Sequence, residues 1–487
     1  MTIRALAMPW AAPGDRVYSR PCDVLVTLAL GEDPANVPSV FDVRRGRAKP
    51  VESLDGGPID SVVRRYAGGA RAARVHVSAA SLGHENNDRD GGHRGFDAAE
   101  QISGLARSFL LRLPAGSPVG VLAQALSQLA TVTSASPNYV VVTPFDAAPA
   151  RQSFADPQGQ SALAPRALVR AAEALRHEPG DPAMLIGLVD SGVALDHPEI
   201  AGRLRSGYDT VQMDDNGVAS GIHLLGDHDR EDRDPTDRFV GHGMGCAGII
   251  GGLGVRMPPG LAGLAQIIPL RALAAAKLPG KDTPVGLGAI SDLDAAVKLA
   301  VDLGAKVINM SFGTDDSALS NASPKPHADV VRYALDRGCI LVAASGNNGR
   351  DTRYWPAAYD GVIAVGACGN DRLVAGFSTR GAHVALCAPG DRVLSCGLTG
   401  YAEVTGTSFA APFVAAAAAL LVARGQRRAC PVDSAMARDA LMGSAQAFAG
   451  AHEGCGAGIL DAAAALVRLD TIIDQAVPDS PDQIEDG

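Results

Sequence analysis

The sequence lacks an apolar segment long enough to cross a membrane. Its longest apolar run, residues 413–423, is flanked by Pro412 and Arg424 and is far shorter than the roughly 20 residues that a transmembrane helix needs. Residues 1–16 carry one early arginine and a short apolar patch broken by prolines, which is not the pattern of a secretory signal. We therefore expect no membrane partner and a cytoplasmic location, with secretion as the alternative if a leader has been removed.

Clustered positive charge and aromatic residues are also scarce. The chain has 43 Lys and Arg against 53 Asp and Glu, a formal net charge of −10, and only 4% Phe, Trp and Tyr. A nucleic-acid-binding surface needs a basic patch, so we predict no nucleic-acid partner. The 487 residues, 47% of them hydrophobic, suffice for two to four domains and a large buried core.

Cysteines are few, and none has the Cys-x-x-Cys spacing of a zinc or redox site. Two of the eight, Cys246 and Cys339, lie in apolar segments where a buried free thiol is the common state. The pairs Cys387–Cys396 and Cys430–Cys455 are candidates for disulfides in an oxidising compartment only. A cytoplasmic location favours free thiols.

Residues 17–145 have the pattern of a separate α+β domain. Strands are predicted at 23–30, 73–80, 108–114 and 131–143, the last with a turn at Pro137, and helices at 59–66 and 119–129. The order β-α-β-β-α-β is ferredoxin-like. The polar residues of this domain fall in loops such as 83–95, so we expect no chemistry there.

From residue 165 onward strands alternate with helices. An extension at 1–16, a linker at 146–164 rich in Ala and Pro, and an acidic, disordered tail at 473–487 surround the two domains. Within 165–472 the strands are short, continuous and apolar, which is typical of an α/β fold with a parallel central sheet covered on both faces. They are predicted at 184–189, 267–273, 306–310, 339–344, 362–366 and 383–388, with helices at 167–177, 290–303, 328–337 and 413–424.

Polar residues follow several of these strands. Asp190 follows the first, Ser311 the third, and Ser345 begins the loop after the fourth. The carboxyl ends of parallel strands meet at one edge of a sheet, so we expect these residues to converge. Singly they are weak signals, because an aspartate after a strand is usually a turn residue, and a histidine between glycines, such as His242, is more often structural.

Ser408 lies in a stretch of small residues, 404–412, before an apolar helical segment. Pro412 fits near a helix start, where backbone N–H groups have no intrahelical partner. Ser408 is thus expected at or just before a helix N-terminus, which stabilises developing negative charge. With a base nearby it would be a nucleophile, whereas alone it would be an N-cap.

Five segments in one order resemble the subtilisin-like serine peptidases. They are Leu-Val-Asp190-Ser-Gly, Gly-His242-Gly, Val-Ile-Asn309-Met-Ser-Phe-Gly, Ala-Ser-Gly-Asn347 and Gly-Thr-Ser408-Phe-Ala-Ala-Pro. The order Asp, His, Ser is that of the family, and the resemblance covers roughly residues 165–470. It implies a three-layer subtilisin-like fold and a serine endopeptidase acting on polypeptides.

The resemblance also implies a role for each residue. Ser408 would attack the peptide carbonyl, His242 would move the proton, and Asp190 would orient the imidazole. The Asn347 side chain and the Ser408 backbone N–H would bind the oxyanion. Asn309 is expected to brace a strand. Two segments would lie along the extended substrate: Ser311, Phe312, Gly313 and Ala344, Ser345, Gly346.

The sequence departs from the family pattern in places. Met244 stands where a threonine is usual, and no acidic residue is evident in the primary pocket, which favours apolar or neutral side chains before the cut. No cofactor is required, and the family's calcium loop is not recognisable in residues 251–265, which lack any carboxylate. The acidic segment 227–237 is interpreted as an exposed loop, with calcium binding or steering of basic substrates as alternatives.

The N-terminal domain resembles the inhibitory propeptide of such enzymes. This implies that the domain is an intramolecular inhibitor and folding chaperone of a monomeric enzyme, although an unrelated α+β module stays an alternative because its first half matches poorly. A second alternative is a catalytically silent binding or scaffold protein with the same fold. A third concerns the biological role, which is either processing of a dedicated precursor or general degradation.

Overall fold

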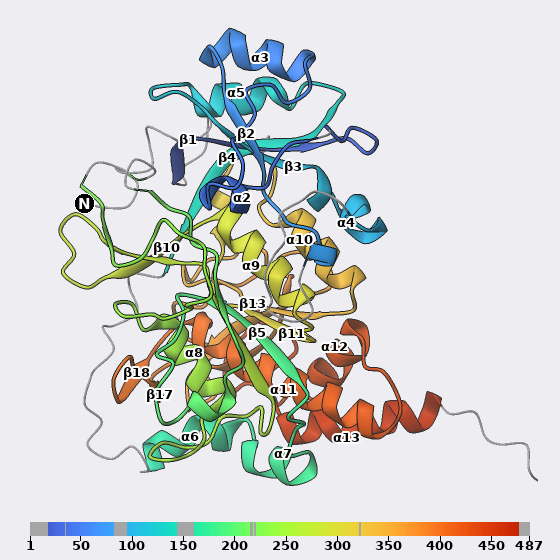
Figure 1. The fold of residues 1–487 in the computed structure, drawn as a ribbon. Helices are drawn as coiled ribbons and strands as arrows, with labels where there is room; N and C mark the ends of the chain where they lie inside the picture. The colour runs from blue at the N-terminus through green and yellow to red at the C-terminus, as the bar shows by residue number, and fades with distance from the viewer. Residues whose placement is uncertain are drawn as a thin grey trace, which may run out of the picture.

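The protein is described by a computed structural model that covers residues 18–34, 36–81, 95–143, 160–214, 218, 221–320 and 323–476. The predicted extension at 1–16, loop residues 83–94, linker residues 146–159 and the tail beyond 476 lie outside the described residues. Figure 1 shows the N-terminal strands and helices, in blue and cyan, above the larger body formed by the rest of the chain.

A seven-stranded parallel sheet forms the centre of the larger body. Its strand order is β16-β15-β13-β11-β5-β8-β6, and every pairing within it is parallel. Nearly all of its residues are buried, as expected for a sheet covered on both faces. The strands are β5 Leu185–Asp190, β6 Tyr208–Asp209, β8 Gln266–Arg271, β11 Val307–Met310, β13 Ile340–Ala344, β15 Val362–Cys368 and β16 Val384–Pro389.

Helices cover both faces of this sheet, which gives the predicted three layers. On one face lie α8 (His242–Gly251) and α11 (Thr407–Arg427), and on the other α9 (Ile290–Asp302) and α10 (Ala328–Asp336). A hairpin of β17 and β18 packs near α8. The remaining elements of this body are α6 Gln160–Leu168, α7 Ala171–His177, β17 Val393–Cys396, β18 Tyr401–Val404, α12 Ser434–Gly443 and α13 Ala462–Ala476.

Helix α11 is almost entirely buried. Contrary to the expectation from the sequence, it is long and apolar enough to cross a membrane by length and composition, but 94% of that window is buried inside the molecule. Its alanines let it pack closely on β11, β13 and β15. The helix begins at Thr407, earlier than predicted, so Pro412 lies inside it.

The N-terminal segments form the predicted β-α-β-β-α-β arrangement. The antiparallel strand order is β2-β3-β1-β4, and α3 and α5 lie together at one side, at the top of Figure 1. The elements are β1 Ser19–Leu28, α2 Val40–Arg44, α3 Pro58–Ala67, β2 Arg71–Arg74, α4 Ala98–Ser103, β3 Ser108–Arg112, α5 Val119–Leu126 and β4 Val132–Val142.

This sheet continues into the larger body. Residues 140–142 of β4 pair antiparallel with residues 287–289 of β10 (Val285–Ala289). Beyond β10 follow β9 (Ala274–Lys277) and β7 (His223–Leu225), which completes a second seven-stranded sheet. The sequence did not predict this seam, because the alternating glycines of β10 have low strand propensity.

Several predicted boundaries are wrong. No turn interrupts β4 at Pro137, which lies opposite Val24 where β10 does not yet pair, and proline is tolerated at such an edge. The helix predicted at 167–177 is two helices, with Arg170 in the left-handed region between them (φ 53°). Residues 160–164 of the predicted linker belong to α6, and residues 473–476 of the predicted tail continue α13.

Candidate active site

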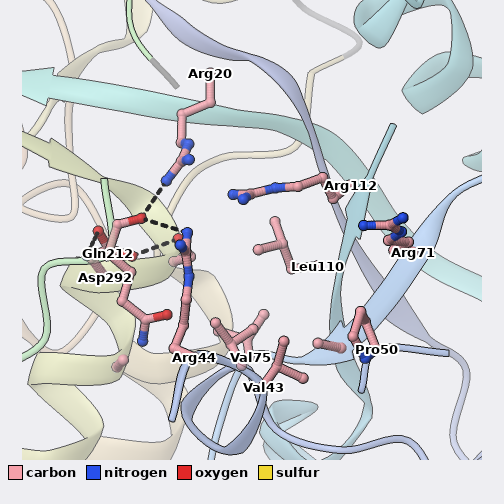
Figure 2. A pocket seen from close by; sticks show the side chains of 14 residues that line it. Arg20, Val43, Arg44, Pro50, Arg71, Val75, Leu110, Arg112, Gln212 and Asp292 are labelled. Atoms are coloured by element: carbon pink, nitrogen blue, oxygen red, sulfur yellow. Dashed lines mark hydrogen bonds between the residues drawn. The ribbon is translucent and has the colours of Figure 1, made fainter. Parts of the chain in front are cut away.

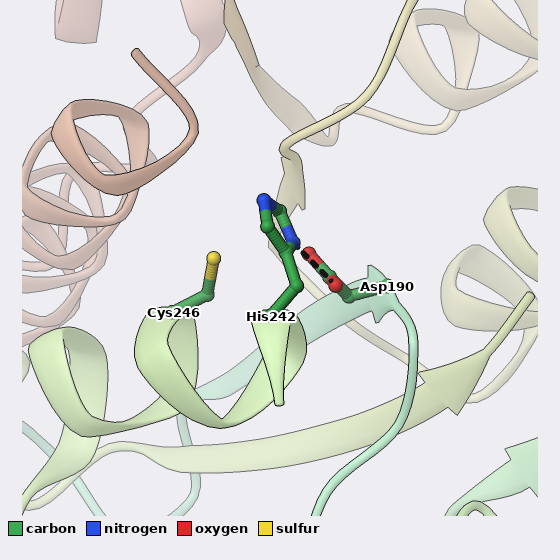
Figure 3. Close-up of side chains that lie close together, drawn as sticks. All are labelled: Asp190, His242 and Cys246. Atoms are coloured by element: carbon green, nitrogen blue, oxygen red, sulfur yellow. Dashed lines mark hydrogen bonds and ion pairs between the residues drawn. The ribbon is translucent and has the colours of Figure 1, made fainter. Parts of the chain in front are cut away.

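Asp190 and His242 meet at the carboxyl edge of the parallel sheet. Asp190 ends β5 and His242 begins α8, and the imidazole Nδ1 lies 2.7 Å from Asp190 Oδ1 (Figure 3). The same carboxylate oxygen accepts the Ser191 backbone N–H at 2.7 Å. Asp190 is 1% exposed. The carboxylate therefore fixes the ring orientation and holds the proton on Nδ1, which leaves Nε2 as the basic nitrogen.

The charge around His242 favours its protonated form. Burial alone would lower the pKa of His242, but the charge and hydrogen bond of Asp190, together with the charge of Asp237, raise this pKa above its usual value. The ring also packs against Phe409, with 5.0 Å between ring centroids. A raised pKa suits a base that must stabilise its own cation during proton transfer.

Ser408 is the second residue of α11, as its predicted position required. Its Oγ donates to the Ser311 carbonyl at 3.3 Å, while the buried Nε2 of His242 has no hydrogen-bond partner among the described residues. The structure therefore brings the three predicted residues into one site without a hydrogen bond between Ser408 and His242. Such catalytic bonds are often long or unformed until substrate binds.

Pro412 has a specific effect on the backbone of Ser408. Proline has no N–H, so the Ser408 carbonyl lacks its usual partner four residues along the helix. The Ser311 hydroxyl donates to this carbonyl at 2.7 Å and the Cys246 thiol at 3.3 Å. Asn309 Nδ2 in turn donates to Ser311 Oγ at 2.9 Å, in keeping with the bracing role predicted for it. Ser408 is thus tied to the segment that follows β11 and to α8, the helix that begins at His242.

The amide of Asn347 is oriented by its neighbour Thr407. Asn347 Oδ1 accepts the Thr407 backbone N–H at 2.8 Å and the Thr407 hydroxyl at 2.9 Å. With the oxygen held in this way, Nδ2 is left to donate elsewhere. Together with the backbone N–H groups at the start of α11, it forms a set of donors beside Ser408.

The two segments predicted to bind substrate lie close to Ser408 and the start of α11. The first, Ser311, Phe312 and Gly313, follows β11, and the second, Ala344, Ser345 and Gly346, runs from the end of β13 into its loop. Both are buried. The Gly346 N–H donates to Thr407 Oγ1 at 3.3 Å, so this segment is linked to α11 as the first is.

The described residues contain one group with the spacing of a metal site, namely Asp190, His242 and Cys246 (Figure 3). A metal-bound cysteine must be a thiolate. Burial, followed by the charge of Asp190, raises the pKa of Cys246 well above its usual value, and the thiol donates a hydrogen bond. This group does not fit a bound metal ion.

Asp237 is a buried residue beside His242 that the sequence did not single out. It is 4% exposed, and its carboxylate accepts the Ser191 hydroxyl at 2.8 Å and the Gly241 N–H at 2.7 Å, just before His242. It lies in the segment 227–237, where Asp227, Asp229 and Asp234 are exposed as expected. Glu231 of the same segment is also buried, at 3% exposed. The run of charge hid both residues, because nothing in the pattern distinguishes buried carboxylates from exposed ones.

The carboxylate of Glu199, which lies in the chain between β5 and α8, reaches into the loop that follows α8. This side chain is 0% exposed; its Oε2 accepts the N–H groups of Gly254 and Val255 at 2.8 and 3.0 Å, and its Oε1 accepts those of Arg256 and Met257 at 2.7 and 3.2 Å. Oε1 also accepts the Tyr401 hydroxyl at 2.9 Å. A calcium ion needs carboxylate oxygens that are free to coordinate. The loop is held by a carboxylate instead, so its residues do not fit calcium.

All eight cysteines are free. The candidate disulfides Cys387–Cys396 and Cys430–Cys455 are therefore absent. Cys387 and Cys455 instead share a buried cluster with Cys368. Sequence separation alone could not reveal this grouping, which depends on the parallel pairing of β15 and β16.

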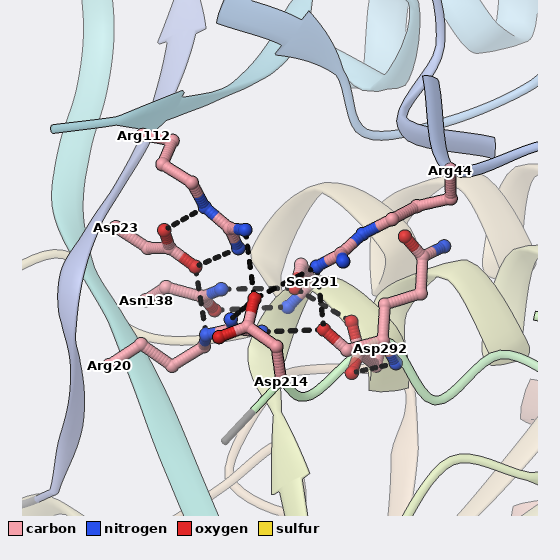
Figure 4. Close-up of polar contacts among 9 residues, drawn as sticks. Arg20, Asp23, Arg44, Arg112, Asn138, Asp214, Ser291 and Asp292 are labelled. Carbon is pink, nitrogen blue, oxygen red and sulfur yellow. Dashed lines mark hydrogen bonds and ion pairs between the residues drawn. The ribbon is translucent and has the colours of Figure 1, made fainter. Parts of the chain in front are cut away.

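Three arginines of the N-terminal part converge on one aspartate of the larger body. Asp214 Oδ2 lies 3.3 Å from Arg20, 3.2 Å from Arg44 and 2.9 Å from Arg112 (Figure 4). Asp23 also pairs with Arg20 and Arg112. Burial alone would raise the pKa of Asp214, but the three guanidinium groups hold it below its usual value. We call this group of five residues the Asp214 clasp: Asp214 at its centre with Arg20, Arg44, Arg112 and Asp23.

A cavity of about 410 Å³ adjoins the clasp (Figure 2). Its lining is partly apolar and partly cationic, and it includes Arg71, Leu110, Val75 and Asp292 besides clasp residues.

A second set of polar contacts joins the N-terminal part to the larger body. Lys298 of α9 lies 2.7 Å from Glu100, and the Thr27 hydroxyl donates to Asp329 of α10 at 2.9 Å.

Comparison with known proteins gives consistent matches. A family model described as the subtilase family matches residues 181–458. Thermophilic serine proteinase of Bacillus sp. (strain AK1) is 37% identical over 254 residues, which cover 51% of this chain and 54% of that protein. Thermitase of Thermoactinomyces vulgaris is 32% identical over 244 residues, 50% of this chain and 75% of that protein. The chain thus spans about half the length of the first relative and three quarters of the second.

A solved structure matches the fold. A protease from Pseudoalteromonas arctica PAMC 21717 superposes with a TM-score of 0.54 at 22% identity, over 64% of this chain and 98% of that one.

The relatives also correct one prediction, the cellular location. They include the extracellular basic protease of Dichelobacter nodosus, 29% identical over 321 residues, and the halolysin-like extracellular serine protease Nep of Natrialba magadii, 31% identical over 247. The predicted cytoplasmic location is therefore wrong; it depended on residues 1–16 alone.

Proposed function

The chain belongs to the subtilase family, and from that premise we propose that it is a serine endopeptidase that cleaves polypeptides through an acyl-enzyme on Ser408. The observation that carries the proposal is the buried Asp190–His242 pair, 2.7 Å apart, in one site with a serine at a helix start and an oriented asparagine amide. A catalytically silent scaffold would have no use for this set of residues.

The reaction follows from the positions of these groups. Ser408 Oγ attacks the peptide carbonyl while His242 Nε2 accepts the hydroxyl proton, after a rotation of the serine away from the Ser311 carbonyl. Asp190 holds the imidazolium that forms. The developing oxyanion receives hydrogen bonds from Asn347 Nδ2 and the Ser408 N–H. His242 then gives the proton to the leaving amine, and water hydrolyses the acyl-enzyme by the same path in reverse.

The N-terminal part, residues 17–145, is proposed to inhibit the peptidase part, residues 165–472, of the same monomer and to assist its folding. Three observations support this role. Strand β4 occupies one edge of β10, the Asp214 clasp joins the two parts electrostatically, and Glu100 and Thr27 bond to α9 and α10. A buried charged contact such as Glu100–Lys298 also fixes the orientation in which the parts dock.

The test is intact mass of the purified protein beside its Ser408→Ala variant, each with and without a fluorophosphonate probe. The wild type alone is expected to gain the mass of the probe and to shorten by cutting its own chain between the two parts. Probe addition without shortening would retain the peptidase and remove the cleaved inhibitor. A folded wild type that takes up no probe would contradict the proposed activity.

A further inference from the structure

Tyr354 lies directly behind the substrate-side segments. It belongs to β14 (Tyr354–Trp355), which pairs antiparallel with β12 (Thr314–Asp315). Strand β12 continues the segment Ser311, Phe312, Gly313, so the pairing brings Tyr354 next to it. The partner residue of Tyr354 in the register is Asp315.

The aromatic ring of Tyr354 lies between the two segments. A Cβ atom placed on Gly313 would be 2.6 Å from Tyr354 Cε1, and one placed on Gly346 would be 2.9 Å from Cδ2. No side chain fits at these distances. Other atoms close both positions as well, because the Trp355 carbonyl oxygen would lie still closer to the Cβ at Gly313, and Thr379 Oγ1 would lie 2.8 Å from the Cβ at Gly346. Gly346 also has a φ of +105°, which further restricts it to glycine. The ring thus fills the space that the two backbones enclose.

This space adjoins the nucleophile. One wall is connected to Ser408 through the Ser311 carbonyl, which accepts the serine hydroxyl. The other wall is connected to the start of α11 through the Gly346 N–H and then continues into Asn347. When Ser408 attacks a peptide bond, the side chain just before that bond must enter between these walls.

The neighbours of Tyr354 hold it in this position. The indole N–H of Trp355 donates to Asp316 Oδ1 at 2.8 Å, and its ring packs at a tilt of 52° against Tyr359 with centroids 4.5 Å apart. Asp315 is fixed by Asn348 Nδ2 at 2.7 Å. Burial, followed by the charge of Asp315, raises the pKa of Tyr354. The side chain is therefore neutral and adds no charge to the pocket.

We propose that Tyr354 fills the primary specificity pocket and restricts cleavage to peptide bonds that follow a small residue, namely glycine, alanine or serine. The inference rests on the proposed peptidase function and names its substrate class. It narrows the preference for apolar or neutral side chains expected from the sequence. A pocket that excludes a side chain sterically discriminates by about 10–200-fold for each misfitting group, so a strong preference against phenylalanine and leucine is expected.

The test compares two peptidyl diphenyl phosphonates that differ only in the side chain next to phosphorus, one the alanine analogue and the other the phenylalanine analogue. The rate at which each modifies Ser408 is followed by intact mass, with the protein as purified and after any self-cleavage is complete. The wild type is expected to react at least about 10-fold faster with the alanine analogue. Tyr354→Gly, which opens the pocket, is expected to lose or reverse this preference.

Tyr354→Phe is the matched control, because it keeps the ring and removes only the hydroxyl; it should keep the wild-type preference. If Tyr354→Gly does not fold, the ratio of the wild-type rates with the alanine and phenylalanine analogues, together with this control, still tests the proposed preference for small residues. Equal or faster reaction of the wild type with the phenylalanine analogue would overturn the inference, as would reaction with neither analogue while the small fluorophosphonate labels Ser408. A folded wild type that the fluorophosphonate fails to label would remove the proposed function and this inference with it.

Discussion

Replacing Glu199 by glutamine should destabilise the loop after the histidine helix. The carboxylate accepts four backbone N–H groups and one hydroxyl within 3.2 Å. Glutamine can keep its oxygen toward Arg256, Met257 and Tyr401. Its amide nitrogen then faces the N–H groups of Gly254 and Val255, which places donor against donor in a buried site.

The magnitude follows from those two lost bonds. A hydrogen bond to a charged group contributes about 1.5–3 kcal/mol, and a buried donor left unpaired costs a similar amount. Two such bonds give an expected loss of about 3–6 kcal/mol in the free energy of unfolding, a large share of the roughly 5–15 kcal/mol that holds most domains folded. Tyr401→Phe removes a single bond and should cost about 1.5–3 kcal/mol.

The assay is urea unfolding followed by tryptophan fluorescence, with every variant made in the Ser408→Ala background so that self-digestion does not distort the curves. Each curve is measured with calcium and with a chelator. Since the Glu199 carboxylate holds this loop through its N–H groups and its oxygens are taken up by those hydrogen bonds, the wild-type midpoint should be insensitive to calcium at this site. Glutamine should lower the midpoint equally in both conditions.

Two results would refute this reasoning. One is a Glu199→Gln variant within about 1 kcal/mol of the parent. The other is a variant whose lost stability returns when calcium is added.

The pH dependence of the stabilisation by Glu199 has a defined sign. Burial alone would raise the pKa of Glu199, but its donors hold the pKa below its usual value. The stabilisation it gives is therefore present above the pKa of an unfolded glutamate, about 4.3, and is lost as the pH falls through the lower folded value.

Two further substitutions test the site and the domain contact. Asp237→Asn should lower the pKa of His242, because it removes a nearby negative charge. The acid limb of the profile of kcat/KM against pH should therefore move to lower pH. A change in rate without a shift of that limb would assign Asp237 a structural role only. Asp214→Asn should weaken docking of the N-terminal part by about 2 kcal/mol, or about 30-fold, and raise the peptidase activity of the intact chain. The matched control is Asp229→Asn on an exposed aspartate, and equal activity of the two variants would contradict a role for the Asp214 clasp.

The positions of the residues proposed as catalytic could be predicted from the sequence because their signals are local. Asp190 directly follows an apolar strand and Ser408 directly precedes an apolar helix, so one rule about strand ends and one about helix starts bring them together. The parallel sheet followed in the same way from continuous apolar strands. The hydrogen bond between Ser408 and His242 is not formed, since a serine rotamer depends on its contacts and not on its place in the chain.

The residues that the sequence did not reveal act through contacts distant in the chain. Tyr354 meets Gly313 and Gly346 only because β14 pairs with β12, and nothing beside Tyr354 in the sequence indicates a pocket. Glu199 follows a proline in a turn and reaches N–H groups more than 50 residues away. The strand β10 was missed because its two glycines lower its strand propensity.

The seam between β4 and β10 has a consequence for solubility. While β4 is in place, β10 has a partner on each side. Departure of the N-terminal part would leave the backbone groups of residues 287–289 unpaired, and a bare strand edge invites pairing with other copies. An extended peptide can use that edge, but aggregation competes for it. Strands interrupted by glycine pair weakly, and β10 has glycines at positions 286 and 288. The exposed edge should therefore bind an extended peptide transiently and resist stable aggregation between copies of the freed enzyme.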